Sequence, residues 1–134
     1  MASEVSGLSD RESSSTGGGR AMITMIALGT MFQLAMVLSG HYVALIKNNV
    51  FALGGMFISL VFAALYARAS ARSKPGAAAG GALVGGLCAL IGIAVSCAMG
   101  DVEPFILVAG TGGSAVAGAI GGLVAFVVAD AKRV

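Results

Sequence analysis

The sequence predicts an all-α integral membrane protein with four transmembrane helices arranged as two antiparallel hairpins. Hydrophobic residues make up 57% of the chain and charged residues only 10%, which is too little polar composition to cover a soluble domain of this size. The apolar residues fall into four long segments whose interiors contain no Asp, Glu, Lys or Arg. Small residues recur at every fourth position in the last two segments, a spacing typical of helices that pack closely in lipid.

The N-terminal segment, residues 1–20, differs from the rest of the chain. It is polar, and a run from Ser13 to Thr16 is followed by three consecutive glycines. Such a segment has too little apolar surface to offset the entropy lost on ordering. It is also polar for too long to be the start of a cleaved signal peptide. We therefore expect a disordered cytoplasmic tail before a transmembrane domain that covers residues 21–134.

The transmembrane domain contains four apolar spans, at about 21–46, 50–67, 77–99 and 104–128. At a rise of about 1.5 Å per residue, each is long enough to cross roughly 30 Å of hydrocarbon, the second only just. Helices are expected because backbone groups in lipid must be paired within the segment. The connections are short, so consecutive spans run antiparallel, and the first pairs with the second and the third with the fourth.

The third and fourth spans carry a glycine zipper, which is a row of small residues at i, i+4 and i+8 on one side of a helix. Such a row leaves a groove into which a second helix backbone fits. The residues expected to form this packing surface are Gly81 and Gly85 in the third span and Gly110, Ser114, Gly118 and Gly122 in the fourth. A second row in the fourth span, from Gly113 through Ala117 and Gly121 to Ala125, is either used within the same chain or faces a partner subunit.

The basic residues predict the orientation of the spans. Seven of the eight Lys and Arg residues lie before the first span, between the second and third, or after the fourth, and only Lys47 lies on the opposite side. The positive-inside rule then places both termini and the middle loop in the cytoplasm. The turn at 47–49 and the loop with Asp101 and Glu103 face outward. We expect a multi-pass protein of a bacterial inner (plasma) membrane.

Two polar residues of the first span are candidates for a polar seam. Gln33 and His41 form an i+4 row on one side of the helix, with Val37 between them. Ionisable groups at membrane depth are costly and often serve transport or binding. A histidine near the interface also reaches water, and a glutamine in mid-span also hydrogen-bonds to neighbouring helices. Both interpretations stay open at this point.

An acidic pair, Asp101 and Glu103, precedes Pro104 in the loop between the third and fourth spans. Proline favours the first turn of a helix, and carboxylates before it cap free N–H groups and interact with the positive end of the helix dipole. The pair therefore predicts a helix cap. The alternative is a ring of carboxylates at the outer mouth of an oligomeric pore.

No arrangement of residues in the sequence indicates catalysis or a bound cofactor. His41 has no sequence-local partner that would form a catalytic pair with it. Cys88 and Cys97 lie about 13 Å apart along one helix, beyond the roughly 7 Å that a disulfide bridges. The glycine-rich runs do not continue as phosphate loops, and no cluster of ligand residues suggests a metal site. The basic middle loop lies beside two spans, so lipid headgroups rather than nucleic acid are its expected partner.

These observations favour a non-catalytic structural or accessory subunit that acts through helix–helix packing with another membrane protein or with itself. This interpretation accounts for the glycine rows, the short loops and the lack of charge inside the spans. A small transporter or a channel-forming oligomer is the alternative. A holin-like pore is less favoured, because the chain has four spans and no strongly charged tail.

Overall fold

The computed structural model describes residues 2–43, 51–71 and 73–133, with side chains from Thr16 onward. Over these residues the chain is all helical. The helices are α1 (Ala2–Tyr42), α2 (Phe51–Ser70), α3 (Lys74–Ala98) and α4 (Pro104–Ala131). All four are long and apolar enough to cross a membrane, α1 through its Thr16–Tyr42 part. The predicted helical class and the four candidate spans are confirmed. The expected turn at 47–49 lies outside the described residues.

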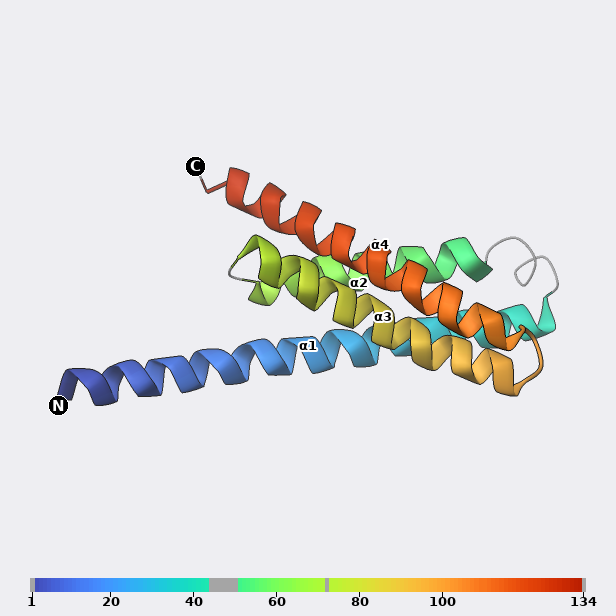
Figure 1. The fold of residues 1–134 in the computed structure, drawn as a ribbon, viewed down its shortest axis with the longest axis horizontal. Coiled ribbons are helices and arrows are strands. Elements are labelled where there is room, and N and C mark those ends of the chain that lie inside the picture. The colour runs from blue at the N-terminus through green and yellow to red at the C-terminus, as the bar shows by residue number, and fades with distance from the viewer. Residues whose placement is uncertain (1, 44–50, 72, 134) are drawn as a thin grey trace.

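Helix α1 is longer than the sequence predicts, because it begins at Ala2 rather than near residue 21. The structure thus has residues 2–20 within this helix, where the sequence predicts a disordered tail. No proline occurs before Pro75, so nothing in the local chain chemistry stops a helix that is anchored in the apolar segment from extending toward the N-terminus. As a result α1 projects beyond the other three helices at the end where the C-terminus also lies (Figure 1).

The ends of α3 are set by local hydrogen bonds. At its start, the Ser73 hydroxyl accepts a hydrogen bond from the backbone N–H of Gly76 at 3.2 Å, which is an N-cap that the sequence analysis missed. At its end, the backbone N–H of Asp101 donates to the carbonyl oxygen of Ser96, and the backbone N–H of Gly100 donates to the carbonyl oxygen of Cys97, each at 3.0 Å. This is a Schellman turn, and Gly100 takes the required positive φ of 75°.

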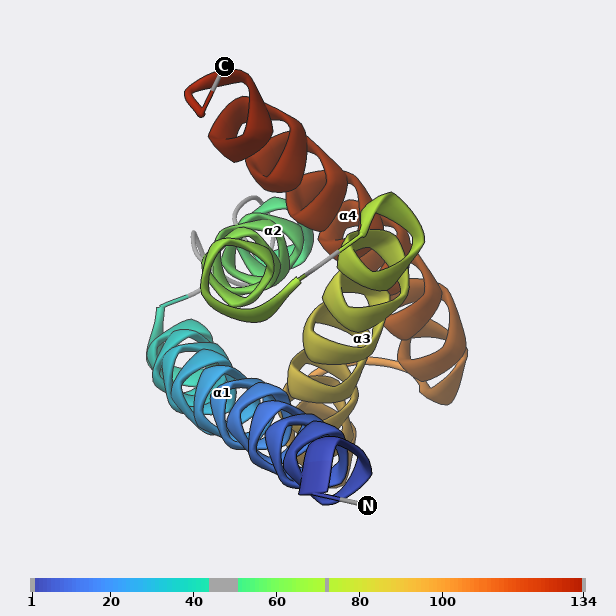
Figure 2. The ribbon, with the colours of Figure 1, turned by 90° about the vertical axis from the view of Figure 1, so that its left-hand side faces the viewer.

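The four helices form a bundle in which consecutive helices run in opposite directions (Figure 1). Helices α2 and α3 each contact the other three helices, whereas α1 and α4 lie on opposite sides and make no contact within the described residues (Figure 2). The bundle therefore does not separate into two independent pairs, and the division into hairpins stays a prediction.

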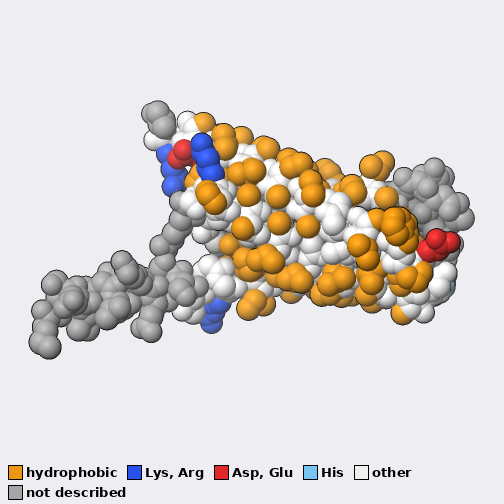
Figure 3. All heavy atoms as spheres, in the orientation of Figure 1, with side chains coloured by type: hydrophobic (Ala, Val, Ile, Leu, Met, Phe, Trp, Pro, Cys, Tyr) orange, Lys and Arg blue, Asp and Glu red, His pale blue; other side chains and the backbone are white. Residues whose placement is uncertain are grey.

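The core is small and lies where α2 and α3 meet. Phe62 and Tyr66 of α2 pack around Val84 of α3, with Met25 and Ile26 of α1 against them. Large apolar side chains also cover the outside of all four helices (Figure 3). Charged side chains of the described residues lie at the two ends of the bundle, with lysines and arginines and one acidic group at the end that holds the C-terminus and acidic residues at the other (Figure 3). This surface is suited to a hydrocarbon surrounding.

Candidate functional site

The predicted packing row is situated between α3 and α4, where the two backbones come very close. A Cβ atom added at Gly81 would collide with the carbonyl oxygen of Gly118, and one added at Gly118 would collide with the carbonyl oxygen of Gly81. At Gly85 an added Cβ would lie 2.6 Å from the carbonyl oxygen of Ser114, and at Gly122 it would collide with that of Ala77. Only glycine fits at these positions without separation of the helices.

Gly110, the first residue of the predicted row, has a different neighbour. A Cβ there would lie 2.6 Å from the Cδ1 atom of Ile93, which is the far end of a side chain rather than backbone. The closest approach of α3 and α4 therefore begins at Ser114, one turn later. The contribution of the row to folding in a membrane stays a prediction, which the substitutions in the Discussion test.

The second row of α4 faces α2 of the same chain. A Cβ at Gly121 would collide with the carbonyl oxygen of Leu60, and one at Gly113 with the end of the Met56 side chain. The glycines of both rows thus meet helices of the same chain, those of the first row α3 and those of the second row α2. Ala125, at the end of the second row, lines a hollow on the outer surface.

Gln33 is buried in the bundle, where it begins a chain of hydrogen bonds across three helices. Its side chain is 2% exposed, and its Nε2 donates to the carbonyl oxygen of Gly55 at 3.0 Å and lies 3.5 Å from the Ser59 hydroxyl. Ser59 in turn donates to the carbonyl oxygen of Gly85 at 3.1 Å. These hydrogen bonds link α1 to α2 and α2 to α3. A hollow of about 50 Å³ lies beside Gln33.

Cys88 completes the same polar cluster. Its thiol is fully buried, donates to the carbonyl oxygen of Gly85 at 3.4 Å and lies 3.8 Å from the Ser59 hydroxyl. Neither Ser59 nor Cys88 was identified from the sequence as part of a polar site. Both residues lie on the helix faces that meet Gln33. Which faces meet is determined by the packing of the helices and not by the sequence around either residue.

His41 does not share the environment of Gln33. It is exposed at the end of α1, and its Nδ1 lies 2.9 Å from Oδ2 of Asp101 in the α3–α4 connection. The imidazole N–H is the donor in this contact, because an ionised carboxylate only accepts. The Schellman turn at the end of α3 positions Asp101 for the contact. The two members of the predicted polar seam thus contact different parts of the bundle.

The acidic pair is split in the structure. Glu103 is the N-cap residue of α4, but its side chain makes no capping hydrogen bond, while Asp101 contacts His41. The predicted side-chain cap is therefore absent at Glu103, since Pro104 removes one of the N–H groups that such a cap would satisfy.

Within the described residues, no group of three or more His, Cys, Asp and Glu side chains is placed to hold a metal ion. No protein-family model, no curated protein and no solved structure matches this chain.

Proposed function

We propose that this chain is a non-catalytic membrane subunit that serves a structural or accessory role through its outer helix surface. The observation that carries the proposal is the use of the internal polar groups. Gln33 and Ser59 hydrogen-bond to backbone carbonyls of neighbouring helices, so they hold the bundle together. The hollow beside Gln33, about 50 Å³, has room for about one or two water molecules and not for an organic solute.

The proposal includes how the helices associate in the bilayer. We infer that the third and fourth spans pair through the glycine zipper and that the first pairs with the second, so that the chain enters the membrane as two antiparallel hairpins. Because the glycines of both small-residue rows of α4 meet helices of the same chain, a partner contacts the bulky apolar side chains outside. The partner is another membrane protein or a second copy of this chain, with lipid covering the rest.

The proposed location is a bacterial inner membrane with both termini in the cytoplasm. The support is electrostatic. Arg68 and Lys74 flank the connection between α2 and α3, and Lys132 and Arg133 follow α4, whereas Asp101 and Glu103 lie in the opposite connection. Basic residues in short loops remain on the cytoplasmic side.

Cysteine labelling tests this orientation. The native cysteines are first removed by the substitutions Cys88→Ala and Cys97→Ser. A single cysteine is then introduced by Ala71→Cys in one protein and by Val102→Cys in another. A membrane-impermeant maleimide should label the Val102→Cys protein in cells with a permeabilised outer membrane. It should label the Ala71→Cys protein only after the inner membrane is opened. The reverse pattern contradicts the orientation.

The accessory role is tested by native mass spectrometry of the chain extracted gently from its own membrane. A reproducible complex with a different membrane protein, retained in a Gln33→Leu variant, supports the proposal, because a buried residue does not contact an outside partner. A chain that emerges alone, with lipid only, contradicts it. A closed homo-oligomer fits a second copy as the partner and also fits a channel, and the ion-flux measurement below separates these two functions.

A transport role is the second candidate, and one observation favours it. His41 and Asp101 lie 2.9 Å apart at the acidic end of the bundle, and Gln33 lies on the same helix two turns deeper. Protonatable groups followed by a polar interior residue are typical of a proton or cation path. Ion flux into proteoliposomes that is lost in both Asp101→Asn and Gln33→Leu variants would establish this function in place of the accessory role.

A further inference from the structure

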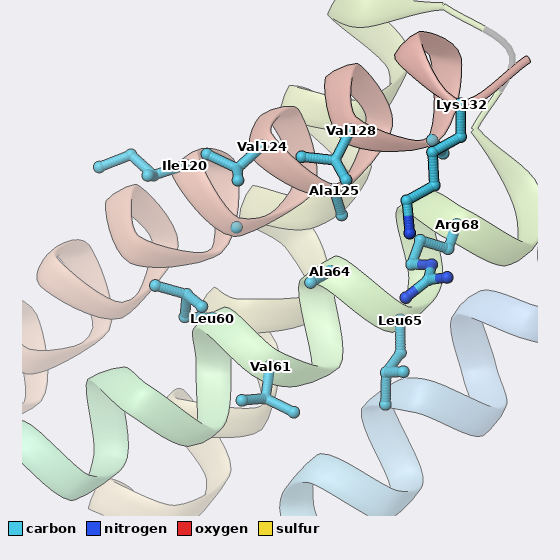
Figure 4. Close-up of a pocket in the computed structure, with 12 residues that line it drawn as sticks. Leu60, Val61, Ala64, Leu65, Arg68, Ile120, Val124, Ala125, Val128 and Lys132 are labelled. Carbon is cyan, nitrogen blue, oxygen red and sulfur yellow. The ribbon is translucent and has the colours of Figure 1, made fainter.

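The outer surface is hollowed between two of the helices. The hollow is a groove of about 410 Å³ between α2 and α4 (Figure 4). The two helices touch at Gly121, against the Leu60 backbone, and toward the C-terminus of α4 they separate (Figures 1 and 2). Leu65 and Val128 form parts of its walls, and the short side chains of Ala64 and Ala125 leave the space between them open.

The groove ends at two cations. Arg68, in the last turn of α2, and Lys132, at the end of α4, direct their charged groups toward one another (Figure 4). Neither forms a salt bridge with an acidic side chain within the described residues. A smaller hollow beyond Arg68 is lined by Asp130 and Arg133. The net charge of these two residues together with Arg68 and Lys132 is positive.

The size of the groove decides what fits in it. From Ile120 to Lys132 it runs about 18 Å along α4, which is close to half of the roughly 30 Å thickness of bilayer hydrocarbon. An 18 Å length of helix about 10 Å across occupies on the order of 1,400 Å³, several times the 410 Å³ of the groove. The groove therefore suits a single extended hydrocarbon chain better than a second helix.

We propose that this groove binds one anionic phospholipid from the leaflet at the basic end of the bundle. One acyl chain lies along the apolar walls between α2 and α4, and the phosphate sits between Arg68 and Lys132, where it relieves the repulsion of two neighbouring cations. The proposal rests on the membrane placement proposed above and not on the accessory role, so a chain without protein partners can still carry the lipid.

The test uses the full purified chain, stripped of lipid and placed in detergent with equal amounts of phosphatidylglycerol and phosphatidylcholine of the same acyl length. Native mass spectrometry then counts the lipids retained. We expect one phosphatidylglycerol retained with a preference of about tenfold or more, because each basic side chain near an anionic headgroup favours binding by roughly fivefold. Equal retention of the two lipids overturns the proposal.

Matched charge variants show whether the groove or the general surface charge is responsible. The Arg68→Gln, Lys132→Gln double variant should lose the preference. The Arg20→Gln, Lys74→Gln double variant removes the same charge from the same end of the bundle but not from the groove, and it should keep the preference. If both pairs reduce the preference equally, surface electrostatics explains it and the site is rejected.

A second pair of variants tests the apolar part. Ala125→Phe fills the groove and should reduce retention of both lipids, whereas Val127→Phe, on α4 but outside the groove, should not. Melting temperatures close to that of the original chain check that both variants fold. If the chain is instead a dimer that Ala125→Phe converts to a monomer, a second copy occupies the groove and the lipid proposal is wrong.

Discussion

Two interfaces of this bundle join helices by different physical means. Between α3 and α4, the backbones meet at Gly81 and Gly118, and no side chain lies between them. Between α1 and the rest of the bundle, the Gln33 side chain spans the gap and hydrogen-bonds to the backbone at Gly55. In lipid the hydrophobic effect does not drive helices together, so close packing and hydrogen bonds must do so. The first interface uses close packing and the second adds hydrogen bonds.

The difference predicts how each interface tolerates change. A backbone carbonyl that is bonded within its own helix cannot move aside without moving the helix, and α3 and α4 are each held by α2 as well. Helix α1 packs against α2 and α3 less extensively than α4 does within the described residues, so it can shift with the loss of fewer contacts. We therefore expect the glycine interface to be rigid and the α1 interface to be adaptable.

The largest expected effect comes from Gly118→Leu. The new side chain collides with the Gly81 carbonyl, so the free energy of unfolding should fall by about 3 kcal/mol or more. Gly112→Leu is the matched control, because Gly112 lies on the same helix with nothing within 4 Å of an added Cβ, and its effect should stay within about 0.5 kcal/mol. Unfolding by SDS titration, followed by circular dichroism, measures both. Equal losses contradict the glycine interface.

The same small substitution in both interfaces compares them directly. Gly81→Ala places a methyl group against a backbone carbonyl, and Gly92→Ala places one 2.9 Å from Cβ of Gln33. We expect losses of about 2 kcal/mol at Gly81 and about 1 kcal/mol at Gly92, because α1 can move away. A larger loss at Gly92, in the same titration, would show that α1 is held as tightly as α4.

The hydrogen-bond chain should contribute less than the close packing. Ser59→Ala removes the bond from α2 to the Gly85 carbonyl, and such bonds between membrane helices contribute about 0.6 kcal/mol on average. The control is Ser39→Ala, because Ser39 bonds at 2.8 Å to Ala35 in its own helix and should have almost no effect. A shift in thermal melting for Ser59→Ala but not for Ser39→Ala supports the difference.

The smallest effect is expected at the end of α1. A double-mutant cycle with His41→Ala and Asp101→Ala should give a coupling of about 0.2–1 kcal/mol, since the His41 side chain is 38% exposed. The cycle that pairs His41→Ala with Glu103→Ala should give none, because Glu103 belongs to the same connection but not to the contact. A coupling of the same size in both cycles would indicate a general charge effect.

How far the sequence predicts this molecule differs from one element to the next. The spans from Phe51 and from Pro104 begin within a residue of their predicted positions, because proline and the change from polar to apolar composition act locally. The first helix is predicted less well, since whether a polar segment joins an existing helix depends on what anchors that helix. The cap at Ser73 was predictable from Ser73 and Pro75 but was overlooked.

The candidate sites illustrate the same limit. The spacing of Gly118 and Gly122 predicts that a helix can approach α4, but not which helix does so, and the second row has the same spacing with a different partner. His41 and Asp101 are each identifiable from the sequence as polar residues at one end of a span. Nothing in their sequence positions predicts that they meet.

The sequence by itself determined that the chain forms four apolar helices with charge confined to their ends. These properties depend on the transfer of each segment between water and lipid, which is a sum over its own residues. Only the tertiary structure decided that Gln33 reaches Gly55, that the glycines of both small rows of α4 meet helices of the same chain, and that Arg68 and Lys132 close one groove. Those contacts depend on the rotation and lateral position of whole helices, which spacing within a single helix does not set.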